Sequence, residues 1–508
     1  MLWVPIVVPL LLMLVAASVP SSVAATARFR PLLVPLGGLI HLGVVTLMIV
    51  RGEGAPGQSA GQGGSSAGWD SSWGWGWLAL DDLSRLVLPL FSVVFFACSL
   101  YVPVYLRLRQ ERSNRVFSAA LLGFLAMGTL IVETHHLGLM WVALEACALA
   151  TAPLLFFNEN ARSLEATWKY LLLGAVGIAL ALLGTLFLAY SALYAGIEST
   201  LVLDDVLREA PRLSRPWLHG AFILLFIGYG TKMGLAPMHT WKPDAYGESP
   251  GVVGALLAGG MTACVFLALL RFFQICAAAN ELAFARQIFV AGGLFSVGVG
   301  AAFMVRQGDY KRMLAYSSVE HMGLLVLGVG VGGVAVLGAL LHLLNNGLAK
   351  AAMFMAAGNI HRAYGAKTVD RVSGALDRVP VSATLFLAGF FALTGTPPFG
   401  TFVSEFTILR GAMAAGHVGI AAVLMGLLLL AFVAMGSTVL KVVHGPATAS
   451  TEEDGARGGG GVRFRDSLAT VGPAIALLLG VCFLGLVVPT QLNAALLAAA
   501  RMIEGGRP

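Results

Sequence analysis

The sequence predicts an all-α, polytopic membrane protein with about 14 transmembrane helices. Hydrophobic residues make up 58% of the 508 residues and charged residues only 11%, which excludes a water-soluble globule with a solvated surface. Apolar runs long enough to cross a hydrocarbon core of roughly 30 Å follow one another along the whole chain. These two observations set the fold class before any motif is considered.

The apolar runs give the expected spans in chain order. The spans cover residues 2–24, 32–50, 84–106, 116–132, 137–157, 170–195, 218–246, 251–276, 286–306, 317–333, 335–358, 381–409, 417–442 and 466–489. Spans 7 and 12 in this series are interrupted by glycine and proline. The first run has no basic segment in front of it, so we expect a retained span and not a cleaved signal peptide.

Basic residues are distributed unevenly between alternate loops. The loops after the odd-numbered spans hold about 20 of the 32 Lys and Arg residues, and the other loops hold about 10. Because Lys and Arg concentrate on the cytoplasmic side, we expect both termini on the opposite, periplasmic side. The same asymmetry accounts for the net charge of +6, so we expect no nucleic-acid partner.

All five cysteines fall in or beside apolar runs, and the sequence has no Cys-x-x-Cys pair. They are typical of small core residues, so we expect no iron–sulfur or zinc site. The sequence also has no nucleotide-binding loop. We therefore expect neither a cofactor nor a metal in this chain.

Span 7 is interrupted beside a lysine. The stretch from Gly228 to Ala245 contains Lys232 and, shortly after it, Pro237 and His239. Unpaired backbone groups at membrane depth are tolerated only against protein or a water-filled cavity, and an ionisable side chain there costs about 2.5–3.5 kcal/mol on insertion scales. We therefore expect Lys232 to line a polar path. The alternative is a lysine that reaches the membrane surface.

Span 5 carries an acidic residue at depth, Glu145, with no other charge in the same run. A buried carboxylate needs a partner or a proton, and we expect Glu145 to pair with Lys232. The alternative is a neutral Glu145 that serves packing only. Residues 133–136, which end span 4, could line an outer exit, but the sequence favours an exposed loop cluster.

Span 10 begins with Glu320 and His321, which form either a proton inlet or a helix cap. Lys311 and Arg312, just before it, are expected to anchor the chain at the cytoplasmic surface.

Span 11 contains His342, Asn346 and Lys350 at intervals of four residues. This spacing places the three side chains on one helix face, with a drift of about 40° per step. Packing alone does not explain a polar stripe that ends in a lysine, so we expect a functional path.

Span 12 repeats the pattern of span 7. A break that contains Pro397 is followed by Glu405. Two broken helices five spans apart indicate two inverted repeats of five helices each. The predicted domains are 1–110 (helices 1–3), 111–280 (first repeat, helices 4–8), 281–445 (second repeat, helices 9–13) and 446–508 (a cytoplasmic linker and helix 14).

Four motifs carry a family resemblance, at residues 232–245, 309–323, 342–350 and 397–405. They resemble the antiporter-like membrane subunits shared by respiratory complex I, Mrp-type cation/proton antiporters and group 4 membrane-bound hydrogenases. Residues 144–146 and 162–170 are most similar to the F subunit of hydrogenase-4-type complexes.

The resemblance implies a role for each buried polar residue. Glu145 and Lys232 match the family's paired acid and base. His342 and Lys350 match its central relay, and Glu405 matches its outlet-side group. Supporting positions are His239, Asn346, Pro237, Pro397 and His321. The chain departs from many relatives at Asn346, where they have a second histidine, and at Lys242 and Tyr246.

The resemblance predicts a proton-translocating subunit of a membrane-bound redox complex in the bacterial inner membrane. The chain would have no redox centre of its own, so other membrane subunits and a soluble redox partner would supply the energy. Two alternatives stay open. One is an Mrp-type subunit that exchanges Na⁺ or K⁺ for H⁺, and the other is a proton-driven module of an inorganic-carbon uptake complex with a zinc-type soluble partner. A purely structural scaffold is disfavoured, because several ionisable groups lie at membrane depth.

Overall fold

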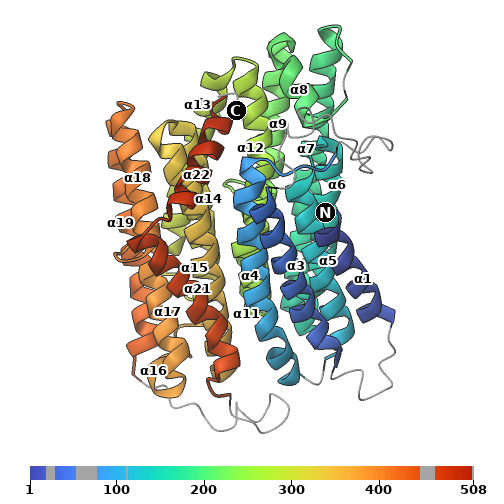
Figure 1. Ribbon diagram of the computed structural model, residues 1–508. Helices are drawn as coiled ribbons and strands as arrows, with labels where there is room; N and C mark the ends of the chain where they lie inside the picture. Colours follow the sequence, from blue (N-terminus) through green and yellow to red (C-terminus); the bar gives the residue numbers. More distant parts are fainter. Residues whose placement is uncertain (19–28, 53–76, 110–111, 199, 447–463, 506–508) are drawn as a thin grey trace.

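The computed structural model describes residues 1–18, 29–52, 77–109, 112–198, 200–446 and 464–505. In these ranges every regular element is a helix, and the β-structure is limited to isolated bridges. The long helices run side by side in one bundle (Figure 1). The predicted all-α class is confirmed. The predicted cytoplasmic linker falls largely on residues 447–463, outside the described part.

The helix bounds are as follows. In chain order the helices are α1 (Val4–Ser18), η1 (Arg30–Leu32), α3 (Leu33–Arg51), α4 (Asp82–Arg107), α5 (Asn114–Glu133), α6 (Leu137–Leu155), η2 (Phe156–Asn158), α7 (Ala161–Tyr194), α8 (Leu203–Glu209), η3 (Ala210–Arg212), α9 (Arg215–Met233), α10 (Trp241–Glu248), α11 (Gly251–Leu256), η4 (Leu257–Met261), α12 (Thr262–Ala278), α13 (Leu282–Met304), α14 (Tyr310–Val331), α15 (Val334–Tyr364), α16 (Ala375–Arg378), α17 (Pro380–Leu393), α18 (Gly400–Ala414), α19 (Val418–His444), α21 (Leu468–Leu486) and α22 (Thr490–Ile503).

Within the described ranges, eleven helical segments are long and apolar enough to cross a membrane. The other three expected spans correspond to the short helix α1 and to the two broken runs, α9 with α10 and α17 with α18. The total of 14 spans and the inverted repeats stay predictions. The predicted domain limits at 110, 280 and 445 fall between helices, after α4, α12 and α19.

Both predicted breaks are present. Helix α9 ends at Met233 and α10 begins at Trp241, and α17 ends at Leu393 and α18 begins at Gly400. Each first half-helix is followed by a glycine with positive φ, Gly234 at 85° and Gly395 at 58°. A left-handed backbone favours glycine, so these residues end the half-helices. The interrupted shape of spans 7 and 12 is therefore confirmed.

Two helix limits differ from the expected spans. Helix α7 begins at Ala161 and not near residue 170, because Asn160 and Ser163 form a capping box at its start. Helix α22 was not expected. Its residues Leu496, Ala499 and Ile503 are buried, and the helix packs against α4, α12 and α15. The helix is short and rich in alanine, so its sequence does not form an apolar run long enough to predict a membrane span. A further short helix, α8, lies between α7 and α9.

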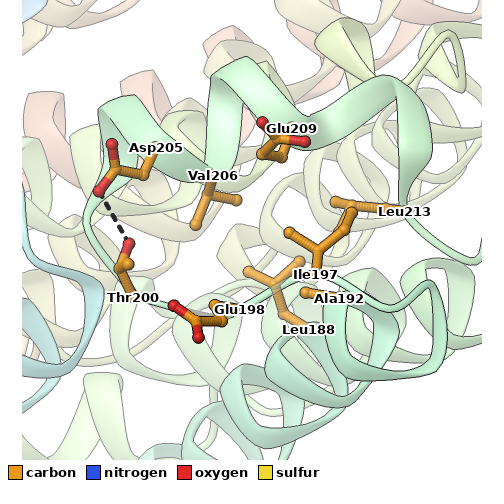
Figure 2. A pocket seen from close by; sticks show the side chains of 9 residues that line it. All are labelled: Leu188, Ala192, Ile197, Glu198, Thr200, Asp205, Val206, Glu209 and Leu213. Atoms are coloured by element: carbon orange, nitrogen blue, oxygen red, sulfur yellow. Dashed lines mark hydrogen bonds between the residues drawn. The ribbon is translucent and has the colours of Figure 1, made fainter.

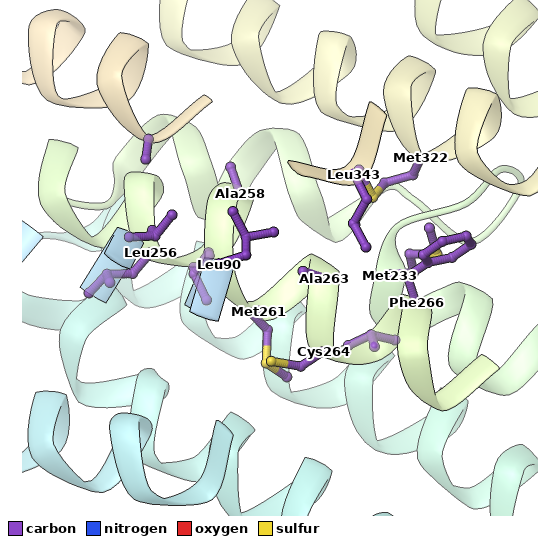
Figure 3. Packing of buried hydrophobic residues seen from close by; sticks show 14 of the residues in the cluster. Leu90, Met233, Leu256, Ala258, Met261, Ala263, Cys264, Phe266, Met322 and Leu343 are labelled. Carbon is purple, nitrogen blue, oxygen red and sulfur yellow. The ribbon is translucent and has the colours of Figure 1, made fainter. Parts of the chain in front are cut away.

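The centre of the bundle is the run α11–η4–α12, whose most hydrophobic stretch is entirely buried. Around it, apolar side chains such as Leu90, Met261, Phe266 and Leu343 pack closely (Figure 3). A Cβ added at Gly259 would lie 2.6 Å from the backbone oxygen of Gly347 in α15, so only glycine permits this approach. Outer helices such as α7 and α19 instead expose large apolar side chains, as expected for helices that face lipid.

Candidate functional site

The first polar contact joins helices α6 and α9. Lys232 lies in the last turn of α9, and its Nζ is 3.8 Å from Oε2 of Glu145 in α6. The Lys232 side chain is 2% exposed and the Glu145 side chain 27%. The predicted pair is therefore brought together, at a distance longer than an ordinary hydrogen bond.

Two residues of α7 shape the space around Lys232. Its Nζ lies 5.1 Å from the ring centroid of Tyr170, within cation–π range. A Cβ added at Gly174 would lie 2.8 Å from the same Nζ, so the glycine leaves room for the ammonium group. Because Lys232 is enclosed by protein, the alternative in which it reaches the membrane surface is wrong.

The break after Lys232 is held by the start of α10. The last carbonyls of a helix have no partner within it. Trp241 donates through Nε1 to the Thr231 carbonyl at 2.8 Å, and Lys242 donates through Nζ to the Met233 carbonyl at 2.8 Å. The carbonyls on either side of Lys232 are thus satisfied by two consecutive side chains of α10.

The supporting residues of this break differ in their placement. Pro237 lies in the break, in a cis peptide bond with Ala236, whose N–H donates to the Ser296 hydroxyl at 3.0 Å. His239 is buried beside the rings of Phe303 and Tyr316, and its Nδ1 has no hydrogen-bond partner among the described residues. Among the described residues, no hydrogen bond or ion pair joins His239 to Lys232 or Glu145.

A second polar cluster lies between α14, α15 and α18. Lys350 of α15 donates to the Ser317 hydroxyl of α14 at 2.6 Å, and it interacts electrostatically with Glu320. Helix α14 begins at Tyr310, so Glu320 and His321 lie well inside it and are buried. The interpretation of these two residues as a helix cap is therefore wrong.

Two histidines continue this cluster. His321 Nδ1 lies 2.9 Å from His342 Nε2, and His342 Nδ1 lies 2.9 Å from the Ser404 hydroxyl. His321, His342 and Glu405 each place one nitrogen or carboxylate oxygen within 4.8 Å of the others. Two hydrogen-bonded imidazoles next to a carboxylate can pass a proton, because imidazole both donates and accepts.

The remaining predicted residues lie close to this cluster. Asn346 is buried, and its Oδ1 has no hydrogen-bond partner in the described part of the chain. Pro397 lies in the α17–α18 break, where a Cβ on Gly395 would collide with the Glu405 carboxylate. Asn346 is thus near Lys350 and His342 on the helix but forms no direct hydrogen bond to either.

Several polar residues of these clusters were not expected from the sequence. They are Tyr170, Ser317, Ser404 and the buried Lys242. The only available signals were the run of polar residues in span 10 and the lysine in the otherwise apolar stretch after Lys232.

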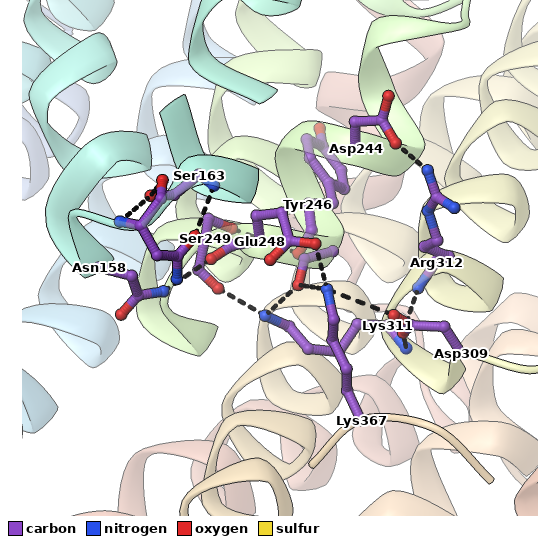
Figure 4. A network of polar contacts seen from close by, with 12 residues as sticks. Asn158, Ser163, Asp244, Tyr246, Glu248, Ser249, Asp309, Lys311, Arg312 and Lys367 are labelled. Carbon is purple, nitrogen blue, oxygen red and sulfur yellow. Dashed lines mark hydrogen bonds and ion pairs between the residues drawn. The ribbon is translucent and has the colours of Figure 1, made fainter. Parts of the chain in front are cut away.

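One end of the bundle carries a network of ion pairs around α10 (Figure 4). Lys311 is fully buried and donates through Nζ to the carbonyls of Gly247 and Ser249, at 3.0 and 2.5 Å. It therefore caps α10, and the expected role of Lys311 as a surface anchor is wrong. A cavity of about 480 Å³ opens beside the network, with Asp244 and Lys367 in its lining.

Asp244 connects three helices in this network. It pairs with Lys169 of α7 at 2.8 Å and with Arg312 of α14. Lys367 pairs with Glu248 of α10 at 2.5 Å and with Asp309 at 3.4 Å. The C-terminal half of the broken span is thus tied to its neighbours at this end.

At the opposite end, Asp81 caps α4 and forms a buried ion pair with Arg271 of α12. Burial raises the pKa of the Asp81 carboxyl, but the Arg271 guanidinium more than reverses this effect and holds that pKa well below its usual range. His135 lies 3.8 Å from Asp81 and 3.6 Å from Asp204 of α8. Residues 77–79, just before α4, pair here with residues 133–135.

The expectation that residues 133–136 form an exposed cluster is wrong, because Glu133, Thr134 and His135 are buried. The cause is the backbone pairing of Trp77 with His135 and of Ala79 with Glu133, at 2.6 and 2.8 Å. A nearby pocket under α8 has a volume of only about 30 Å³, too small for an organic ligand (Figure 2).

Comparison with known proteins agrees with this geometry. A family model described as "NADH:quinone oxidoreductase/Mrp antiporter, TM" matches residues 134–432. The chain is 34% identical over 375 residues to the hydrogenase-4 component F homolog of Methylacidiphilum infernorum, covering 72% of this chain and 78% of that protein. It is 31% identical over 438 residues to NADH-quinone oxidoreductase subunit N of Desulforudis audaxviator, covering 83% of each.

The fold is also similar to a chain of the membrane-bound sulfane sulfur reductase, an archaeal respiratory membrane complex. The TM-score is 0.83 at 20% identity, over 99% of this chain and 97% of that chain. The buried acid–base chain, the broken helices and the match over residues 134–432 agree, and the chain belongs to the NADH:quinone oxidoreductase/Mrp antiporter transmembrane family, as an antiporter-like membrane subunit.

Proposed function

We propose that this chain translocates protons as one subunit of a multisubunit complex, and that Lys232 is the group that exchanges the proton. The observation that carries the proposal is the enclosed Lys232 ammonium, which lies 3.8 Å from Glu145 beside a helix break. An ionisable pair this deep in a bundle costs free energy and is typical of an ion path.

The separation of the pair provides the switch. When Glu145 is close and charged, it stabilises the ammonium form of Lys232. When the two side chains separate, the buried charge loses this compensation, and the proton is released. The partly exposed Glu145 side chain supports this step, because it has room to move.

The second cluster supplies the onward path. The proton passes to Lys350, then through the His321–His342 hydrogen bond, and reaches Glu405 at the second break. Water completes the steps that no direct hydrogen bond covers, including the one beside Asn346.

The setting follows from the relatives and from the distribution of charge. Relatives named as components of NADH-quinone oxidoreductase and hydrogenase-4 support a redox complex with other membrane subunits and a soluble redox partner. The excess of Lys and Arg in alternate loops supports an inner-membrane orientation with both termini in the periplasm. An Mrp-type exchange of Na⁺ or K⁺ for H⁺, and an inorganic-carbon module with a zinc-type partner, are the competing forms of the same transport.

The test replaces Lys232 in the complex isolated with its native partners. The complex is reconstituted in lipid vesicles that contain a pH-sensitive dye, and a potential is imposed with K⁺ and valinomycin. Lys232→Ala should abolish proton movement, since it leaves Glu145 without the basic side chain that lies 3.8 Å from it. Lys169→Ala, on the neighbouring helix α7 and 44% exposed, is the matched control and should transport normally.

Two outcomes decide between the alternatives. Normal proton movement through Lys232→Ala, in a complex of unchanged subunit composition, contradicts the proposal. Proton movement that requires Na⁺ would instead support the antiporter form. Mass spectrometry of the purified complex identifies the soluble partner in either case.

A further inference from the structure

A second buried lysine lies at the same helix break. Lys242, the second residue of α10, is fully buried and is among the largest enclosed side chains of the chain. Its Nζ donates to the Met233 carbonyl at 2.8 Å and lies 5.5 Å from the ring centroid of Tyr246. A Cβ on Gly234 would lie 2.9 Å from this Nζ, so the side chain folds back over the break.

The charge of Lys242 is not compensated by an acid. None of the ion pairs between described residues includes Lys242, whereas Lys232 has Glu145. The titratable groups that interact electrostatically with Lys242 include Lys350 of α15, His321 of α14 and His239 in the break itself. Two buried ammonium groups repel each other, so Lys242 and Lys350 are least costly when only one of them holds a proton.

The position of Lys242 connects the two polar clusters. Its ammonium binds the carbonyl of the residue that follows Lys232, and two of its electrostatic neighbours, Lys350 and His321, belong to the second cluster. The central run from Gly251 to Ala278 contains no Asp, Glu, His or Lys, and its single arginine, Arg271, is paired with Asp81 near the opposite end of the bundle. The central helix therefore offers no comparable proton-carrying side chain.

We propose that Lys242 is a second proton carrier at this break and links the Lys232–Glu145 pair to Lys350 and His321. The inference rests on the proposed function, since it concerns the path that the proton takes after Lys232. In each step one proton leaves an ammonium N–H and binds the lone pair of a neutral amine or imidazole, directly or through water. No electron is transferred. Repulsion between Lys242 and Lys350 disfavours charging both at once, so a proton that arrives at one group promotes release from the other.

The test separates this role from a purely structural one, in which Lys242 only caps the Met233 carbonyl. Lys242→Gln keeps an N–H donor for that carbonyl but cannot carry a proton. Lys242→Arg keeps the donor and the charge but does not release its proton. In the vesicle assay with the native complex, both variants should lose proton movement by at least about tenfold. If either variant transports at the normal rate, the inference is wrong and Lys242 is a cap.

One further measurement keeps the test decisive. Lys242→His retains a donor and a titratable nitrogen, so the pH at which proton movement is half-maximal should shift downward, because free imidazole has the lower pKa, about 6.5 against 10.4 for lysine. An unchanged pH profile contradicts the inference, and this readout applies even if the other variants fail to assemble.

The control is Lys311→Gln, which removes the fully buried ammonium that caps the other end of α10. It should reduce the yield of complex without lowering proton movement per assembled complex. Transport that is lost in Lys232→Ala but normal in Lys242→Gln refutes only this inference. Transport that persists in Lys232→Ala refutes the proposed function itself.

Discussion

The two polar clusters differ in how tightly they are held. Lys232 and Glu145 are 3.8 Å apart, and the Glu145 Oε2 has no hydrogen-bond partner among the described residues. In the second cluster, Lys350, His321 and His342 are connected to neighbours by hydrogen bonds of 2.6 to 2.9 Å. A pair with no direct hydrogen bond has no fixed geometry to keep when its members move apart, whereas a hydrogen-bonded chain keeps its geometry. We infer that the first cluster switches and the second conducts.

Of the substitutions that test this contrast, His342→Leu should lower proton movement most, since it removes both hydrogen bonds of the His342 imidazole. Proton movement should fall by about a hundredfold, the lower end of the range for loss of a positioned proton-transfer group. The matched control is His219→Leu on α9, because His219 pairs with Glu281 near one end of the bundle. Equal effects of the two substitutions would show that His342 does not carry the proton.

A smaller effect is expected from Ser404→Ala. The Ser404 hydroxyl holds His342 Nδ1 at 2.9 Å and donates to the Thr401 carbonyl at 2.8 Å. Loss of one such hydrogen bond is worth about 1 kcal/mol, so proton movement should fall about fivefold. Ser404→Thr, which keeps the hydroxyl, should restore most of the rate. If Ser404→Ala transports as fast as the unmodified protein, the orientation of His342 does not depend on this contact.

The smallest effect is expected in the loose cluster, from Tyr170→Leu. This change removes the ring that lies 5.1 Å from Lys232 Nζ, a cation–π contact worth about 1 kcal/mol. The apparent proton affinity of the transport step should change by less than tenfold. Tyr170→Phe keeps the ring and should behave almost as the unmodified protein. A Tyr170→Leu effect as large as that of His342→Leu would remove the distinction between a switching and a conducting cluster.

The sequence was sufficient for those features that oppose their surroundings. A lysine, a glutamate and two proline-containing breaks stand out in apolar runs, and the structure places Lys232 next to Glu145 and Glu405 beside His342. Burial that depends on distant segments could not be predicted. The sequence predicts that Lys311 is a basic surface residue, but its ammonium is buried against the carbonyls at the end of α10. The sequence likewise predicts that Glu133 is exposed, but residues 77–79 pair with the backbone of residues 133–135 and cover it. Helix α22 was missed because its contacts with α4 and α15, and not its hydropathy, stabilise it.

The contact between Gly259 and Gly347 bears on which ion can move between the two halves. A Cβ at either glycine would lie within 3.0 Å of the other residue's backbone oxygen, so at this level α15 and the central helix touch backbone to backbone. A sodium ion that kept its water shell would need a gap several ångströms wide. A proton needs only an unbroken series of hydrogen-bond donors and acceptors. A hydrated ion therefore cannot pass between α15 and the central helix at the level where these two glycines meet.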